Sequence, residues 1–144
     1  MKKVEVKVRV KTTPENIISA FTNPDKLRTW WLVERALIDK KPDGLYTLAW
    51  NITENGFGYV STGIIKEYKS GRELVIDHMV YLNPERPFFG PMKLTVRAEK
   101  KNETTMAYIC QEGYQEGKDW DWYYSAVKQA WPAVIQRLKE YLEK

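Results

Sequence analysis

The sequence predicts an α+β fold in which a curved antiparallel sheet of about six to seven strands wraps around one long C-terminal helix. Three observations indicate this fold. Residues 119–144 carry apolar side chains at steps of three and four, the spacing of one helical face. Residues 32–114 consist of short strand-like segments joined by turns too short for the crossovers of a parallel sheet. Two short helices are expected between the first strand and the rest of the sheet.

The N-terminal segment indicates a strand followed by a helical elbow. Valine alternates with charged residues over Val4–Val10, which predicts a strand with one buried face. Thr13-Pro14 and Asn23-Pro24 each combine an N-cap residue with a proline suited to the first helical position. These pairs predict two short helices, and the second ends at Trp30-Trp31.

Four turn sequences divide the central region into strands. They contain residue types that set a fixed φ or tolerate a positive one, as at 41–44, 54–56, 69–71 and 101–103. The strand over 104–113 is apolar on both parities, so its inward face stays open. The loop Asn83–Pro91 carries Phe88-Phe89, an aromatic pair that is costly to leave in water. It is interpreted as a lid over a cavity or as a contact with a second subunit.

The long helix begins in an acidic segment. Asp119 and Asp121, with Glu112 and Glu116 upstream, are expected to cap the helix and offset its dipole. A metal site is the less favoured interpretation, because no histidine or cysteine follows close by in this segment.

Composition restricts the classes of protein that fit. A chain of 144 residues, 43% hydrophobic, suggests one domain over residues 1–144. No apolar run is long enough for a membrane span or a signal peptide, so we expect a cytoplasmic protein without membrane insertion. The net charge of +4 is spread along the chain and gives little support to nucleic-acid binding. Six Trp and nine Tyr favour a pocket or an interface.

Several segments resemble one known superfamily. Phe21–Trp31 is similar to its elbow of helix, Asn-Pro and tryptophan, and Gly63–Glu67 followed by Glu73–Ile76 resembles its central hairpin. Thr105–Tyr114 with Ala130–Ile135 resembles its last strand and helix. This is the helix-grip fold of the START and birch-pollen-allergen proteins, or SRPBCC superfamily. The similar branch is named for the activator of the heat-shock chaperone ATPase.

The resemblance implies a cavity between the sheet and the helix, and we expect it to bind a hydrophobic small molecule without a cofactor or metal. Candidate wall residues are those that side-chain parity or the helical stripe turns inward, together with Trp30 or Trp31 near the mouth, since at most one of the two can face the interior. They are Trp30, Trp31, Tyr46, Leu48, Trp50, Tyr59, His78, Met92, Tyr123, Val127 and Trp131.

Two other functions stay open. The resemblance includes cyclase and aromatase enzymes, for which His78, of the same parity as Ile76, or a cavity tyrosine of lowered pKa would transfer protons. No Ser/His/Asp set, phosphate loop or metal cluster supports other chemistry. The third class is a protein-binding module like the chaperone activator, and a second copy of the chain is a further candidate partner.

Overall fold

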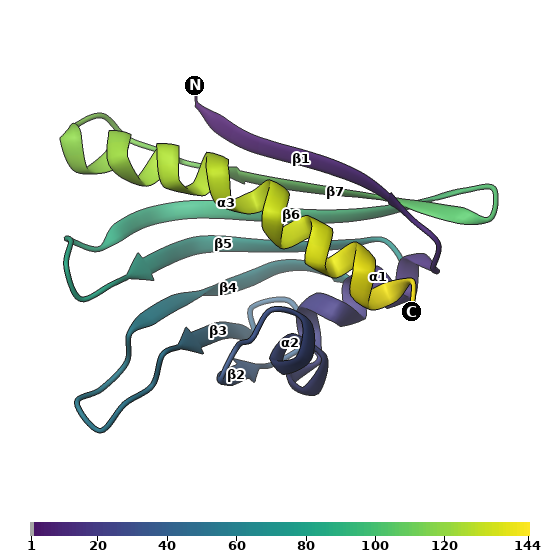
Figure 1. Ribbon diagram of the computed structural model, residues 1–144, viewed down its shortest axis with the longest axis horizontal. Helices are drawn as coiled ribbons and strands as arrows, with labels where there is room; N and C mark the ends of the chain where they lie inside the picture. The colour runs from purple at the N-terminus through teal and green to yellow at the C-terminus, as the bar shows by residue number, and fades with distance from the viewer. Residues whose placement is uncertain (1) are drawn as a thin grey trace.

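The computed structural model describes residues 2–144 and has the expected architecture. One curved, unclosed antiparallel sheet has the strand order β1-β7-β6-β5-β4-β3-β2, and the long helix α3 lies across its concave face (Figure 1). The elements are β1 (Lys3–Val10), α1 (Pro14–Thr22), α2 (Pro24–Trp30), β2 (Arg35–Ile38), β3 (Leu45–Trp50), β4 (Tyr59–Lys69), β5 (Glu73–Leu82), β6 (Phe89–Lys101), β7 (Thr104–Glu112) and α3 (Lys118–Leu142). The α+β helix-grip prediction is confirmed.

The two caps of the helical elbow form as the sequence predicts. The Thr13 hydroxyl accepts from the amide of Asn16 at 3.2 Å, and Pro14 is the first residue of α1. The side-chain oxygen of Asn23 accepts from the amides of Asp25 and Lys26 at 2.9 and 3.2 Å, which starts α2. Each cap satisfies amides that the first helical turn leaves without a partner.

The start of α3 differs from the prediction. Its N-cap is Gly117, at φ 128°, and no side chain of the described residues caps the helix. Asp119 and Asp121 lie inside the first turn, where they favour the helix dipole but also form ion pairs. Asp119 pairs with Arg86 at 3.1 Å, and Asp121 pairs with Lys2 at 3.2 Å. The acidic residues therefore connect the helix to other segments.

The pairing of β7 with β1 determines which residues of β7 face α3. Val6 lies opposite Ile109 and Val8 opposite Ala107, so the parity of the β1 valines places Ile109 and Gln111 toward α3. Burial agrees, because Ala107, Ile109 and Gln111 are 0%, 1% and 4% exposed. A neighbouring strand thus decides a face that β7 alone leaves ambiguous.

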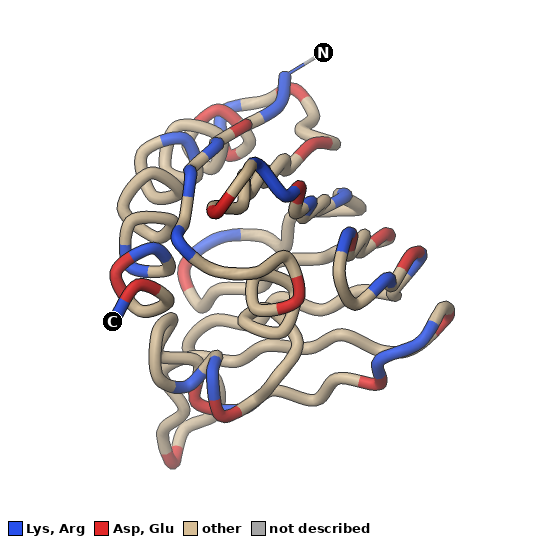
Figure 2. Tube along the Cα trace, turned by 90° about the vertical axis from the view of Figure 1, so that its right-hand side faces the viewer, with Lys and Arg blue, Asp and Glu red and all other residues tan. Residues whose placement is uncertain are grey.

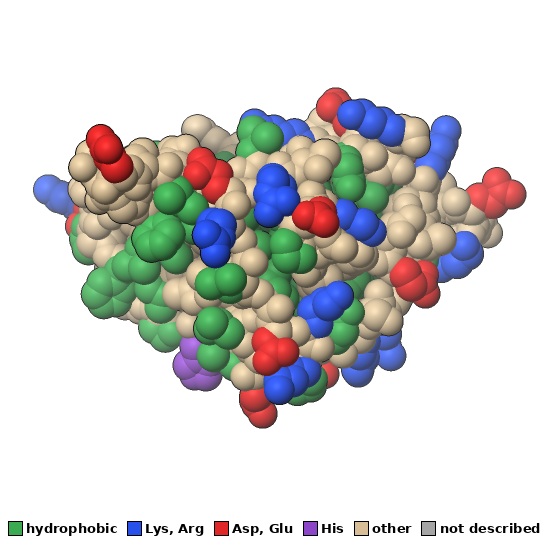
Figure 3. Space-filling model, turned by 90° about the horizontal axis from the view of Figure 1, so that it is seen from below, with side chains coloured by type: hydrophobic (Ala, Val, Ile, Leu, Met, Phe, Trp, Pro, Cys, Tyr) green, Lys and Arg blue, Asp and Glu red, His purple; other side chains and the backbone are tan. Residues whose placement is uncertain are grey.

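A β-bulge in β5 reverses the expected direction of His78. The register shifts between Ile76 and Met79, and His78 has a φ of +51°. Because two residues occupy the bulge, Met79 and Tyr81 face the concave side and His78 is exposed. Figure 3 shows His78, in purple, projecting from the surface. The inward position predicted for His78 is wrong.

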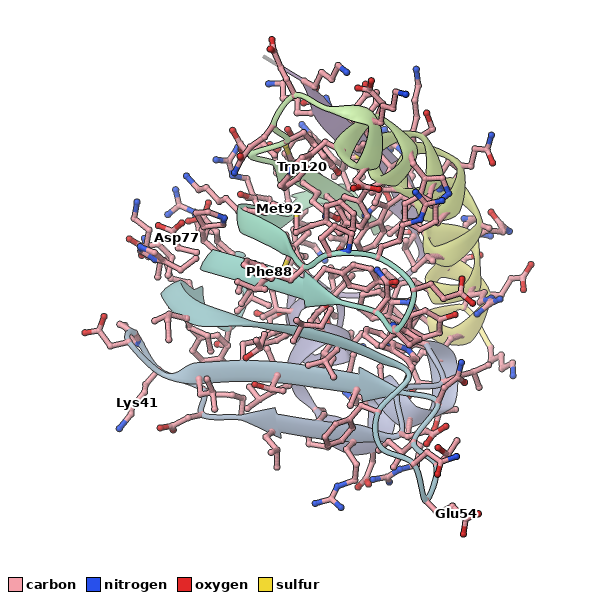
Figure 4. All side chains as sticks on the ribbon, turned by 90° about the vertical axis from the view of Figure 1, so that its left-hand side faces the viewer. Lys41, Glu54, Asp77, Phe88, Met92 and Trp120 are labelled. Carbon is pink, nitrogen blue, oxygen red and sulfur yellow. The ribbon has the colours of Figure 1, made fainter. Side chains whose placement is uncertain are left out.

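The loop between β5 and β6 separates the two adjacent phenylalanines. Phe88 is 66% exposed, whereas Phe89 begins β6 and is 1% exposed. The Phe89 ring stacks on Tyr123 of α3, with centroids 4.5 Å apart. The loop crosses between the sheet and α3 (Figure 4), where Arg86 also lies 4.2 Å above the Trp122 ring. One end of the sheet is therefore connected to the first turns of α3.

Charged residues of both signs are interspersed along the chain (Figure 2). Within residues 2–144, none of the helices has the length and apolar character needed to cross a bilayer.

Candidate functional site

A cavity of about 310 Å³ lies between the concave face of the sheet and α3, and it opens to solvent. Its floor comes from β3 to β7, and the tryptophan pair after α2 contributes Trp31. The α3 side is made of one face of successive turns of the helix, from Trp122 to Val134. No residue that lines it, among those the structure describes, is charged.

Most of the residues that the sequence selects do line this cavity. Those on its wall are Trp31, Tyr46, Leu48, Trp50, Tyr59, Tyr123, Val127 and Trp131. They come from two periodicities. Alternate residues of β3 and the first residue of β4 face inward, and α3 turns every third or fourth residue toward the sheet.

Three predicted wall residues lie elsewhere. Trp30 is buried behind Trp31, with their rings stacked at 5.2 Å. Met92 is buried below the cavity floor, where its sulfur lies 3.5 Å from the Gln111 amide nitrogen. His78 is on the outer side of the bulge in β5. The sequence-based assignments of these three residues to the wall are wrong.

Other wall residues were not predicted. They are Ser61, Met79, Tyr81, Leu94, Gln111, Trp122, Ala126, Ala130 and Val134. Met79 and Tyr81 could not be found by alternation because the bulge shifts their parity. Ser61 and Leu94 share parity with Tyr59 and Met92, a signal that was present in the sequence. Gln111 is polar on a strand whose inward face was ambiguous.

Aromatic rings form two groups at the cavity. Trp31 contacts Trp50 and Trp131, with centroid distances of 5.3 and 5.5 Å. On the other side, Tyr81 stacks between Tyr59 and Tyr123, at 6.4 and 5.2 Å. Such pairs contribute about 0.5–1.5 kcal/mol beyond the area they bury. The wall is therefore made of rings that support one another before any ligand arrives.

Two of the predicted aromatic residues have a structural role at the end of α1. The Trp30 indole donates to the backbone oxygen of Ala20 at 2.8 Å, and the Tyr46 hydroxyl donates to that of Phe21 at 2.6 Å. A helix leaves its last carbonyls without amide partners, and these side chains supply the missing donors. The polar atom of Tyr46 is thus used by the fold, and only its ring faces the cavity.

One buried polar group joins the floor to the helix. The Trp131 indole nitrogen donates to the Gln111 side-chain oxygen at 3.0 Å. The Gln111 amide nitrogen donates to the Tyr123 hydroxyl oxygen at 2.9 Å. All three residues line the cavity, and each is no more than 6% exposed. This Trp131–Gln111–Tyr123 relay is a buried chain of hydrogen bonds that connects the sheet to α3 across the wall.

Burial raises the pKa of three cavity tyrosines, whereas a tyrosine that acts as a base needs a lowered pKa. It raises the pKa of Tyr46 and of Tyr123 above the ordinary value, although the hydrogen bond from Gln111 partly opposes the shift at Tyr123. Burial, with a smaller contribution from Tyr59, raises the pKa of Tyr81 to about 12. These hydroxyls therefore stay protonated at neutral pH, and each keeps a hydrogen that it can donate.

Comparison with known proteins identifies the family. Residues 11–143 match the family described as activator of Hsp90 ATPase homolog 1-like protein. The chain belongs to this family. Family membership and the observed fold place it in the SRPBCC superfamily, as its elbow and helix motifs suggested. No curated protein matches the sequence.

Solved structures of low sequence identity share the fold of this family member. The Aha1 dimer of Colwellia psychrerythraea is 17% identical, with a TM-score of 0.73 over 99% of this chain and 97% of that one. Protein MLL2253 of Mesorhizobium loti is 18% identical, with a TM-score of 0.77 over 98% and 96%. CalU16 of Micromonospora echinospora is 15% identical, with a TM-score of 0.70 over 97% and 75%. The fold is consistent with ligand binding or with cyclase-like roles.

Proposed function

We propose that this protein binds a flat, hydrophobic small molecule in the cavity between the sheet and α3. The observation that supports the proposal is an uncharged wall of aromatic and aliphatic side chains around about 310 Å³. Ligand sites usually measure roughly 300–1,000 Å³, so this cavity suits a molecule of two or three fused rings.

The shape of the wall favours a flat ligand over a flexible chain. Tyr81 and Tyr123 are nearly parallel, at an interplanar angle of 25°, and so present ring faces on one side. On α3, Ala126 and Ala130 have short side chains and form a row beside the larger Val127 and Trp131. A planar molecule would contact both the rings and this narrow strip of the helix.

The alternatives have less support. A cyclase that uses His78 is disfavoured because His78 is exposed on the outer side of β5. Catalysis by Tyr46 or Tyr123 as a base is disfavoured because burial raises the pKa of each. A chaperone-activator role would rest on the family description alone. A second copy of the chain stays a candidate partner, supported by the exposed Phe88 ring, and sedimentation equilibrium of the purified chain would test it.

Two matched variants of α3 test the binding proposal. Ala126 lines the cavity, and Ala133 is exposed on the same helix away from it. We expect the neutral fluorescent probe N-phenylnaphthylamine to bind the wild-type chain and Ala133→Phe equally well. In Ala126→Phe the new ring occupies the cavity, and binding should weaken by about ten-fold or more, which corresponds to ~1.4 kcal/mol.

The proposal fails if the wild-type chain does not increase the fluorescence of the probe. It also fails if the two alanine variants bind the probe equally. Circular dichroism and thermal unfolding of both variants check that a loss of binding does not reflect a loss of fold.

A further inference from the structure

We propose that the ligand is an uncharged planar molecule with a hydrogen-bond-accepting oxygen, of the aryl ketone or quinone class, and that the Tyr123 hydroxyl donates to this oxygen. Gln111 is the positioning residue, because its amide leaves Tyr123 with a hydrogen to give. This inference rests on the proposed function and adds the ligand's polar chemistry to it.

The argument begins at Trp131, whose indole nitrogen can only donate. It lies 3.0 Å from one side-chain atom of Gln111, so that atom must be the amide oxygen. The other end of the amide is then the nitrogen, which can only donate. It lies 2.9 Å from the Tyr123 hydroxyl oxygen. The orientation of the Gln111 amide thus follows from its neighbours.

Tyr123 is the end of this directional chain. Its oxygen accepts from Gln111, so its own hydrogen must find a different acceptor. Among residues 2–144, the only hydrogen bond at this hydroxyl is the one from Gln111. Tyr123 is only 6% exposed and lines the cavity, so the hydrogen is directed to the cavity or to what occupies it. Burial raises the pKa of Tyr123, which keeps the hydrogen in place at neutral pH.

Other polar atoms on the wall lack this fixed direction. The Trp50 indole is occupied, because it donates to the backbone oxygen of Trp31 at 3.1 Å, and the Tyr46 hydroxyl is occupied at Phe21. Ser61 is half-buried, and its hydroxyl, like those of Tyr59 and Tyr81 on the same wall, can rotate to donate or to accept. Ser61 therefore cannot distinguish an acceptor from a donor, whereas Tyr123 can.

The absence of charge from the wall restricts the ligand further. No lysine, arginine or histidine among the described lining residues could compensate a buried carboxylate or phosphate. A neutral carbonyl oxygen accepts a hydrogen bond without bringing a charge into the cavity. This combination favours an uncharged ketone over a carboxylic acid of the same shape.

Three tricyclic probes of nearly equal shape test the inference. Fluorene has no polar group, fluorenone adds a carbonyl acceptor, and carbazole adds an N–H donor. Each is measured by its displacement of N-phenylnaphthylamine. We expect the wild-type chain to bind fluorenone two- to ten-fold more tightly than fluorene, the range for one neutral hydrogen bond of about 0.5–1.5 kcal/mol. Carbazole should gain nothing over fluorene.

Three variants assign the effect. Tyr123→Phe keeps the ring and removes the hydroxyl, so the preference for fluorenone over fluorene should disappear while fluorene affinity changes less than two-fold. Gln111→Met frees the Tyr123 oxygen to accept, so carbazole should gain affinity relative to fluorenone. A purely structural role of Gln111 would weaken all three probes alike. Ser61→Ala is the matched loss of a hydroxyl and should preserve the preference.

The outcomes separate this inference from the proposed function. Failure of the wild-type chain to bind N-phenylnaphthylamine overturns both, whereas failure of the three tricyclic probes to displace it overturns only the inference. Binding of all three probes with no preference for fluorenone, or with a preference that survives in Tyr123→Phe, overturns only the inference. A preference that is lost in Ser61→Ala and kept in Tyr123→Phe assigns the contact to the other hydroxyl and likewise overturns it.

Discussion

Removal of the Tyr46 hydroxyl tests how the inner end of the cavity is held together. This hydroxyl donates to the Phe21 backbone oxygen at 2.6 Å, and Tyr46 and Phe21 are 2% and 0% exposed. In Tyr46→Phe the ring remains, but a buried carbonyl in the last turn of α1 loses its donor. Leaving a buried polar group unsatisfied costs about 1–3 kcal/mol. We therefore expect the free energy of unfolding to fall by ~2 kcal/mol.

Urea denaturation followed by tryptophan fluorescence measures this change. With an m-value of about 2 kcal/mol/M, the midpoint should fall by about 1 M. The matched control is Tyr59→Phe, because Tyr59 is 39% exposed and its hydroxyl forms no hydrogen bond with residues 2–144. The control should stay within about 0.5 kcal/mol of the wild-type chain. Equal midpoints for the two variants would refute the view that Tyr46 holds the end of α1.

Two further predictions concern the bulge and the buried tyrosines. A Cβ atom at Gly63 would lie 2.7 Å from Ile76 Cγ2 and 2.9 Å from the Asp77 backbone oxygen, so Gly63→Ala should cost about 1–3 kcal/mol in thermal unfolding. An unchanged melting temperature would mean that the sheet yields at the bulge. Burial raises the pKa of Tyr46 and Tyr123 in the folded chain above the ordinary 10.0, so the unfolded chain ionises first. The contribution of these two residues to the free energy of unfolding should be complete below about pH 10. Above this pH the free energy of unfolding should fall by up to ~1.4 kcal/mol per pH unit for each tyrosine. In Tyr46→Phe the fall should be shallower, because only Tyr123 then contributes. Urea midpoints from neutral to alkaline pH measure this slope, and a flat profile would contradict it.

Much of the fold could be predicted because local chemistry and tertiary structure agree. Thr13-Pro14 and Asn23-Pro24 start helices through contacts within four residues, and the valines of β1 alternate because one face is buried. The face of β7 could not be predicted in isolation, since the pairing with Val6 and Val8 decides it. A β-bulge likewise leaves no mark in the alternation of its own strand, so His78 was assigned the wrong face.

At the site, too, some residues could be predicted from local sequence and others depend on tertiary neighbours. Apolar wall residues such as Leu48 and Val127 followed from periodicity, which reports burial. Gln111 did not, because a glutamine on a strand reads as an exposed residue until its partners Trp131 and Tyr123 are in place. Trp30 was misassigned because composition cannot tell an aromatic ring that lines a cavity from one that caps a helix. Polar roles depend on three-dimensional neighbours more than apolar roles do.

The carbonyl contacts at the end of α1 make the two ends of the cavity unequal. Separating Trp30 and Tyr46 from the end of α1 would leave the backbone oxygens of Ala20 and Phe21 without their donors. At the opposite end, Tyr59 and Trp122 are 39% and 43% exposed, and moving them breaks contacts with Tyr81 and Arg86 but leaves no buried hydrogen bond unpaired. We therefore expect a ligand to enter and leave at the end of the cavity formed by Tyr59 and Trp122. Substitutions at this entrance can change ligand selectivity while the rest of the fold is left intact.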